Sequence, residues 1–240
     1  MKNKICIVTG GTGWLGRSVV NALAASGAKI YVPARNLGKF NKIFDNSQTS
    51  DYFALNKIFS FECDITDPSS VNEFIEKVSA LNNGRIDILI NCAGGIQPEI
   101  KVEDLTLEKF NVEWNMNFIT AFNFSVGCLK YMKINNYGRI VSIGSMASLQ
   151  TTAGRFAYSA AKTAVINLMD TISEENKEKN IRCNTIIPSI IDTPDNREWG
   201  SEEDIRKWVK PDEISGIIMD LVSDKYSSVR QSLIKVFGNF

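Results

Sequence analysis

The clearest chemistry in the sequence belongs to Tyr158 and Lys162, which lie four residues apart at the start of a segment with helical hydrophobic period. Side chains at this spacing project from one face of a helix, so the phenol and the ammonium reach the same space. A free tyrosine titrates at roughly pH 10, and a nearby cation stabilises its phenolate. The pair therefore predicts a tyrosine that exchanges protons with a ligand, although the same spacing also arises by chance on exposed helices.

Histidine is absent from the chain, which removes several kinds of active site from consideration. Ser-His-Asp and Cys-His nucleophile systems and His-ligated zinc or iron centres all need this residue. The five cysteines are far apart and are never spaced as a metal or redox pair, so we expect buried, reduced thiols and no metal site. Proton transfer is therefore assigned to Tyr, Lys, Asp, Glu or Cys.

A glycine-rich segment, TGGTGWLG at residues 9–16, follows a short apolar run and precedes a helical pattern. Glycines permit a tight turn and a close approach of the backbone, and the amides at a helix start face an anion along the helix dipole. An ordinary strand-to-helix turn has a similar composition. The glycine-rich segment nevertheless lies after the first strand of a β-α-β unit, and this position favours binding of the pyrophosphate of a dinucleotide.

The end of the second predicted strand bears on which dinucleotide is bound. A carboxylate there binds the adenosine ribose hydroxyls of NAD and excludes a 2′-phosphate, but this chain has Ala34 at that position. The adjacent Arg35 can form a charge-assisted pair with the 2′-phosphate, unless it is simply a solvated surface arginine. The sequence favours NADP over NAD.

The elements that position these site residues follow a regular order in the sequence. Short apolar runs rich in β-branched residues alternate with longer segments of helical period. The predicted strands are Lys4–Thr9, Lys29–Pro33, Ile58–Cys63, Ile86–Asn91, Arg139–Ile143, Arg182–Ile187 and Leu233–Val236. The predicted helices are Trp14–Ser26, Pro68–Ala80, Thr106–Tyr131, Phe156–Asn176 and Pro211–Val222. The strands lack polar alternation, as expected when both faces of a parallel sheet are covered. We predict an α/β, Rossmann-type doubly wound, mainly parallel seven-stranded sheet with helices on both faces, as a single domain over residues 1–240 with ligands at the strand carboxyl ends.

The ordered motifs resemble the short-chain dehydrogenase/reductase family over nearly the whole chain. Gly10, Gly13 and Gly16 follow the TGxxGxxG spacing of its extended branch, whereas the classical branch has glycine where this chain has Trp14. The other motifs are of the classical type. The resemblance implies a catalytic set consisting of Asn117, Ser145, Tyr158 and Lys162.

The same resemblance implies cofactor contacts at the exits of successive strands. The implied cofactor-binding residues are Gly10, Thr12, Gly13, Leu15, Gly16, Arg35, Asp64, Ile65, Asn91, Ala93, Gly94, Tyr158, Lys162, Pro188, Ile191 and Thr193. After Pro188, Ser189 replaces the glycine that is usual in the family.

The family mechanism implies hydride transfer between a nicotinamide and a carbonyl or alcohol carbon. Tyr158 acts as the general acid, and Ser145, thirteen residues before it, orients the reacting oxygen. Lys162 tunes Tyr158 and binds the nicotinamide ribose, while Asn117 holds a proton-relay water near Lys162. Asn115 has a similar setting in the sequence but is not the family residue.

The segment near 189–211 is short and has the pattern of one helical turn, which predicts a short lid and a small or exposed substrate pocket. Its DTPxNR pattern, from Asp192 to Arg197 and followed by Trp208, is similar to one in dihydropteridine reductases. Ser145 and Ala34 depart from those enzymes, and the pattern is alternatively a structural turn in which Arg197 pairs with an acid. A general carbonyl reductase is favoured, for example a 3-oxoacyl-thioester reductase. A dinucleotide-sensing regulator without turnover is the alternative of another class.

The chain has 27 basic and 27 acidic residues, so its formal net charge is zero. This balance disfavours nucleic-acid and membrane-surface partners, and neither a signal segment nor a spanning apolar run is present in the sequence. We expect a cytoplasmic enzyme with a small-molecule substrate. The family resemblance implies a homodimer or homotetramer packed through the two long helices that carry Asn117 and Tyr158. Apolar residues in excess of one helix face, which fit such an interface and an ordinary core equally well, are Phe118, Phe122, Phe124, Leu129, Val165, Leu168 and Met169.

Overall fold

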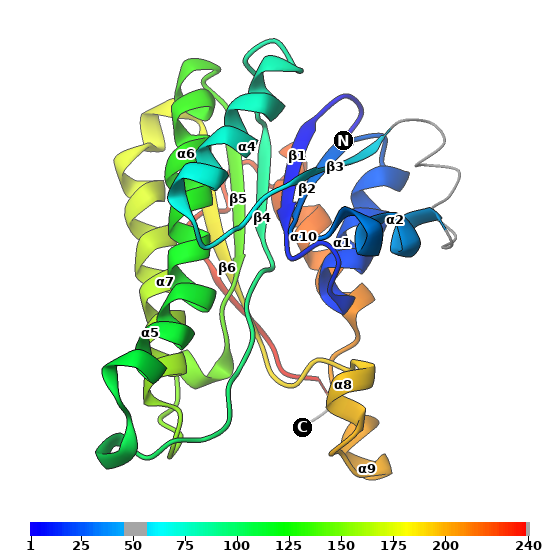
Figure 1. The fold of residues 1–240 in the computed structure, drawn as a ribbon. Helices are drawn as coiled ribbons and strands as arrows, with labels where there is room; N and C mark the ends of the chain where they lie inside the picture. Colours follow the sequence, from blue (N-terminus) through cyan, green and yellow to red (C-terminus); the bar gives the residue numbers. More distant parts are fainter. Residues whose placement is uncertain (46–56, 239–240) are drawn as a thin grey trace.

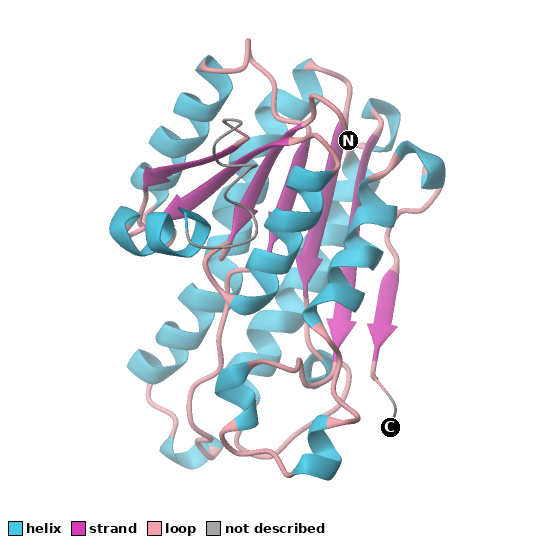
Figure 2. Cartoon of the chain, turned by 90° about the vertical axis from the view of Figure 1, so that its right-hand side faces the viewer, coloured by secondary structure: helices cyan, strands magenta, loops and turns pink. Residues whose placement is uncertain are grey.

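The computed structural model describes residues 1–45 and 57–238, and within them seven strands form one sheet in the order β3-β2-β1-β4-β5-β6-β7. The strands are β1 (Ile5–Thr9), β2 (Lys29–Ala34), β3 (Ile58–Glu62), β4 (Ile88–Asn91), β5 (Gly138–Ile143), β6 (Ile181–Pro188) and β7 (Leu233–Val236). Every neighbouring pair is parallel, so the sheet is wholly parallel where the sequence predicts a mainly parallel one. Figure 2 shows the strand arrowheads pointing toward one edge.

Helices cover both faces of this sheet (Figure 1). One face is covered by α1 (Trp14–Ala25), α2 (Leu37–Asp45) and α10 (Pro211–Val222), whose apolar side chains share a core with β1, β2 and β4. The other face carries α4 (Pro68–Ala80), α6 (Thr120–Ile134) and α7 (Phe156–Glu175), which enclose a second core. The predicted doubly wound α/β fold is therefore confirmed.

Local sequence signals set several of these boundaries. The Asp67 carboxylate caps α4 by accepting from the amides of Ser69 and Ser70 at 3.3 and 2.9 Å, with Pro68 at the first helical position. Gly27, at φ +88°, follows the end of α1 in a conformation that side chains rarely adopt. These residues fix the lengths of the connections that lead back to the sheet.

The long central helix differs from the prediction in one respect. It consists of α5 (Leu107–Trp114), one π-helical turn η2 (Asn115–Ile119) and α6, and it ends at Ile134 rather than Tyr131. A π turn admits one extra residue and changes the direction in which the side chains that follow project. The turn contains Asn117, so the irregularity lies at a predicted site residue.

In the part of the chain that the structure describes, α2 was not predicted, and the segment 189–211, where the sequence predicts one helical turn, contains two short helices, α8 (Pro194–Arg197) and α9 (Glu202–Ile205). α2 is short and has Gly38 in its first turn, which weakens its helical signal. The side-chain oxygen of Asn36 accepts from the Lys39 amide at 2.8 Å and caps it. Remaining short turns are η1 (Val102–Asp104), η3 (Met146–Ser148), η4 (Lys177–Lys179) and η5 (Asp224–Tyr226).

The burial of individual apolar side chains and cysteines differs from residue to residue. Phe124, Val165 and Met169, expected among the surplus apolar residues of the long helices, are fully buried core residues. Phe122 remains 39% exposed. The buried cysteines are Cys6, Cys63, Cys128 and Cys183, and Cys92 is partly buried. In the described residues, no helix has the length and apolarity needed to cross a membrane.

Candidate active site

Tyr158 and Lys162 lie on the first turns of α7, as their spacing predicts. Lys162 is 5% exposed, and its Nζ lies 5.9 Å from the centroid of the Tyr158 ring. This ammonium donates to the carbonyl oxygen of Ile143 at 3.0 Å, which anchors it to the end of β5. Burial lowers the pKa of Lys162 to about 8, against its ordinary value of 10.5. The lysine is therefore a buried cation held next to the phenol.

The hydroxyl of Ser145 lies at the same place because β5 ends directly before it. Its Oγ accepts from the Ala147 amide at 3.2 Å and so caps η3. Burial raises the pKa of the Tyr158 phenol, whereas hydrogen bonding with Ser145 lowers it. The two hydroxyls therefore face the same space, and an oxygen atom of a ligand placed between them would meet two hydroxyl donors.

Asn117 is buried in the π turn, while Asn115 is exposed. The Asn117 Oδ1 accepts from the Gly95 amide at 3.1 Å. A Cβ atom placed on Gly94 would lie 2.8 Å from this Oδ1 and 3.1 Å from the Lys162 Nζ. The structure therefore brings Asn117 and Lys162 next to the same glycine, and the water that would join them stays a prediction.

The glycine turn between β1 and α1 has room only for glycine at two positions. Gly10 has φ +66°, and a Cβ there would lie 2.8 Å from the Ala93 nitrogen. A Cβ on Gly16 would lie 2.2 Å from the Gly10 oxygen. Trp14 is 42% exposed and lies against Arg17, whose guanidinium carbon is 4.6 Å from the ring centroid. The indole thus leaves this close backbone turn intact, and the turn fits a pyrophosphate at the start of α1.

Polar side chains brace the neighbouring strand exit after β4. The Asn91 Nδ2 donates to Ser125 Oγ at 3.1 Å and to Ser142 Oγ at 3.0 Å, which joins β4 to β5 and α6. The Ala93 amide donates to Thr9 Oγ1 at 3.2 Å, which joins the exits of β1 and β4. These bonds hold the backbone of the glycine turn beside Gly94.

The exits of β2 and β3 carry the residues expected around an adenosine. Arg35 is exposed directly after β2. The Asp64 Oδ1 accepts from the amide and hydroxyl of Thr66 at 2.9 and 2.7 Å, and these bonds, with a smaller effect of Arg35, lower the pKa of Asp64. The other predicted cofactor residues lie at the same edge of the sheet: Thr12, Gly13, Leu15, Ile65, Pro188, Ile191 and Thr193.

The segment after β6 is folded back by its own polar residues. Asp192 and Arg197 form a two-point ion pair at 2.5 and 2.7 Å, which lowers the pKa of Asp192. The Thr193 hydroxyl caps α8 by accepting from the Asn196 amide at 3.2 Å. Ser189 donates from its hydroxyl to the Phe237 oxygen at 3.1 Å and so binds the segment after β7. The DTPxNR pattern therefore has a structural role, the alternative that the sequence left open.

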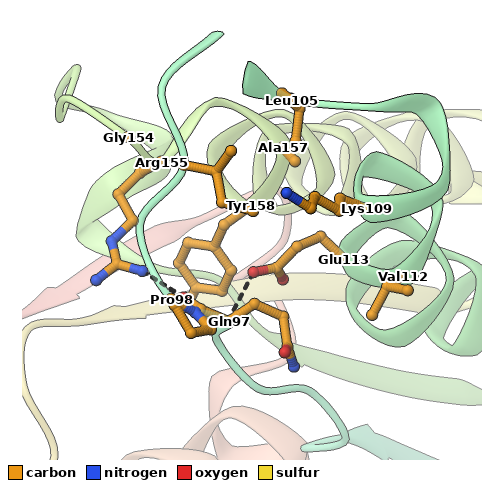
Figure 3. A pocket seen from close by; sticks show the side chains of 11 residues that line it. Gln97, Pro98, Leu105, Lys109, Val112, Glu113, Gly154, Arg155, Ala157 and Tyr158 are labelled. Atoms are coloured by element: carbon orange, nitrogen blue, oxygen red, sulfur yellow. Dashed lines mark hydrogen bonds between the residues drawn. The ribbon is translucent and has the colours of Figure 1, made fainter. Parts of the chain in front are cut away.

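A cavity of about 400 Å³ opens beside Tyr158, between α5, the start of α7 and the chain after β4. Figure 3 shows Glu113, Lys109 and Arg155 around the tyrosine ring, with the Glu113 carboxylate bonded to the Gln97 amide at 2.7 Å. Sequence reasoning missed Glu113. It lies four residues before Asn117, so the spacing argument that singled out the tyrosine and lysine could have found it.

Comparisons with known proteins agree with this geometry. A family model described as short chain dehydrogenase matches residues 4–204. The 3-oxoacyl-(acyl-carrier-protein) reductase of Thermotoga maritima is 28% identical over 246 residues, which cover 99% of this chain and 98% of the relative. The 2,3-dihydro-2,3-dihydroxybenzoate dehydrogenase of Bacillus subtilis is 27% identical over 258 residues, with coverage of 99% and 96%.

Solved structures support the fold. The crystal structure of levodione reductase covers 100% of this chain and 97% of its own chain, with a TM-score of 0.90 at 22% identity. At this identity the likeness concerns the arrangement of the sheet and helices alone. The family match, by contrast, extends over most of the sequence, including the glycine turn and the Tyr158/Lys162 pair. The chain therefore belongs to the short-chain dehydrogenase family and is an oxidoreductase that acts on CH–OH or C=O groups of a small molecule with a nicotinamide dinucleotide.

Proposed function

We propose that this chain is a carbonyl reductase of the 3-oxoacyl-thioester type that prefers NADPH, with Asn117, Ser145, Tyr158 and Lys162 as its catalytic residues. The observation that carries the proposal is the convergence of these side chains at the carboxyl edge of the sheet, beside a cavity that Tyr158 lines. Long matches to 3-oxoacyl-(acyl-carrier-protein) reductases of several bacteria support the substrate class.

The proposed mechanism assigns each proton and hydrogen bond to a side chain. When bound, the nicotinamide supplies the hydride that reduces the carbonyl carbon. Tyr158 donates its phenolic proton to the carbonyl oxygen, so that a C–H and an O–H bond replace the C=O π bond. Ser145 donates a hydrogen bond to the same oxygen. The buried ammonium of Lys162 stabilises the phenolate that remains on Tyr158.

The substrate class is tested by following the absorbance of NADPH with four kinds of acceptor. An acetoacetyl thioester, a simple ketone, a diketone and quinonoid dihydropterin are each offered to the wild-type protein. We expect the thioester to have the highest kcat/KM. A higher value for the diketone or ketone would contradict the thioester assignment, and a higher value for the dihydropterin would support the pteridine alternative.

The preference for NADPH is assigned to Arg35, which lies exposed at the exit of β2. Replacing Arg35 with Asp removes the pairing cation and supplies the carboxylate that binds ribose hydroxyls. We expect the ratio of kcat/KM for NADPH to that for NADH to fall by about tenfold to hundredfold, the effect of losing one charge-assisted hydrogen bond. Lys179→Asp, an exposed charge change in η4, serves as the control. An unchanged ratio in Arg35→Asp would refute the assignment.

The proposed enzyme is a homodimer or homotetramer that packs through α5, α6 and α7. An aromatic row runs along this helix surface through Phe110, Trp114, Phe118 and Phe122, with neighbouring ring centroids 4.6–5.9 Å apart. Phe156 on α7 extends it and is 54% exposed. Exposed aromatic surface of this kind is typical of interfaces. Light scattering should give the mass of two or four chains, and a monomer at micromolar concentration would exclude this assembly.

A further inference from the structure

Glu113 is a buried carboxylate that the mechanism above does not use. It is 6% exposed on the inner face of α5, and no ion pair holds it within residues 1–45 and 57–238. A buried charge is costly unless polar partners compensate it. The polar groups that compensate the Glu113 carboxylate therefore indicate its role.

Both carboxylate oxygens are occupied by groups of the active site. Oε1 accepts from the backbone amide of Gln97 at 2.7 Å, and Oε2 accepts from the side-chain Nδ2 of Asn117 at 2.8 Å. The same Nδ2 donates to the Glu113 carbonyl oxygen at 3.1 Å. The amide group of Asn117 is thereby oriented with its oxygen toward the Gly95 amide. One carboxylate thus fixes both the Asn117 side chain and the chain that leaves β4.

We infer that Glu113 is a positioning residue of this active site, which holds Asn117 and the segment 95–97 in a fixed relation beside Tyr158 and Lys162. Figure 3 shows the carboxylate beside the tyrosine ring and bonded to Gln97, and both side chains line the cavity. The inference rests on the proposed function, because it assigns Glu113 to the same reaction.

The charge of Glu113 acts on two catalytic groups at once. Tyr158 is faced by Glu113, Arg155 and the Ser145 hydroxyl, and Lys162 is faced by Glu113 and Cys92. The carboxylate raises the pKa of the phenol and also that of the ammonium. Removing the charge should therefore lower both pKa values, a change that the loss of a purely structural contact would not produce.

The test compares Glu113→Gln with Glu108→Gln, which makes the same chemical change at an exposed site on α5. An amide at 113 can accept only one of the two hydrogen bonds. We expect kcat to fall about tenfold, the equivalent of one buried donor left unpaired, while the control keeps the wild-type value. Tyr158 must be protonated to donate, and its pKa is lower in the variant. The reduction rate should therefore begin to fall at a lower pH than in the wild type as the pH is raised.

A second measurement does not depend on turnover. Amide hydrogen exchange of residues 94–97 should be about tenfold faster in Glu113→Gln, since the Gln97 backbone amide loses its partner or Asn117 releases the Gly95 amide. In the double variant E113Q/N117D, amide and carboxylate change places, so both backbone amides regain acceptors and slow exchange should return. Unchanged exchange in Glu113→Gln would overturn the inference, as would an unchanged kcat and pH profile. An inactive wild type with this exchange pattern would contradict the proposed function alone.

Discussion

Tyr158→Phe is expected to lower kcat for carbonyl reduction by about 10²–10⁴-fold, the range that a positioned general acid contributes. The substitution removes the phenolic proton and keeps the ring, which packs against the cavity. Lys162 retains its bond to the Ile143 carbonyl, so the local structure should persist. Steady-state kinetics with NADPH and an acetoacetyl thioester measure the loss.

Binding of the dinucleotide separates this result from a folding defect. We expect the Kd of Tyr158→Phe for NADPH, followed by fluorescence titration, to stay within about tenfold of the wild-type value, because the loss of a single hydrogen bond costs about 0.5–1.5 kcal/mol. Tyr226→Phe provides the control, since this partly exposed tyrosine belongs to η5 on a distant part of the chain. Turnover by Tyr158→Phe near the wild-type rate would show that another group donates the proton.

Gly16→Ala is expected to weaken NADPH binding by about tenfold to hundredfold and to lower the free energy of unfolding by about 1–3 kcal/mol, the usual effect of overpacking. The added Cβ would lie 2.2 Å from the Gly10 oxygen and 2.7 Å from the Gly11 Cα. Both neighbours are backbone atoms, so α1 must move away from the turn. The first amides of the helix would then no longer face the pyrophosphate.

Gly216→Ala is the matched control for this experiment. Gly216 lies within α10, and a Cβ there would meet no atom within 4 Å. Helix propensity alone predicts a gain in stability of about 0.5–1 kcal/mol and no change in NADPH affinity. Isothermal titration and denaturant unfolding measure the two quantities for both variants. Wild-type NADPH affinity in Gly16→Ala would contradict the placement of the pyrophosphate at this turn.

Much of the fold could be predicted because its strongest determinants are local in the sequence. Buried parallel strands are short runs without polar alternation, and β1, β2 and β7 begin or end within one residue of their predicted bounds. Asp67 caps the start of α4 and Gly27 follows the end of α1, as the sequence predicted. The helix α2 was missed, and only one turn was predicted where α8 and α9 lie, because segments of four to nine residues give little periodic signal.

In the candidate site too, some residues could be predicted from local spacing and others could not. Tyr158 and Lys162 were predictable because their relation is a fixed helical spacing. The four-residue spacing between Glu113 and Asn117 offered the same signal, but the bond between Glu113 and the Gln97 backbone amide could not be predicted, because it joins residues 16 apart through the path of the chain after β4. The surplus apolar residues illustrate the same limit. Phe124 and Phe122 are two positions apart on α6, yet the first is buried against the sheet and the second is 39% exposed.

Hydride transfer at this site is the step on which the proposed function depends. The decisive measurement is the absorbance of NADPH mixed with the wild-type protein, before and after an acetoacetyl thioester is added. We predict a stable signal before the addition and steady oxidation after it, with a rate proportional to enzyme and reduced about 10²–10⁴-fold in Tyr158→Phe. Tight NADPH binding without oxidation by the thioester, ketone, diketone or dihydropterin would contradict the proposed substrate class and would narrow the choice to an untested substrate or a dinucleotide-sensing regulator.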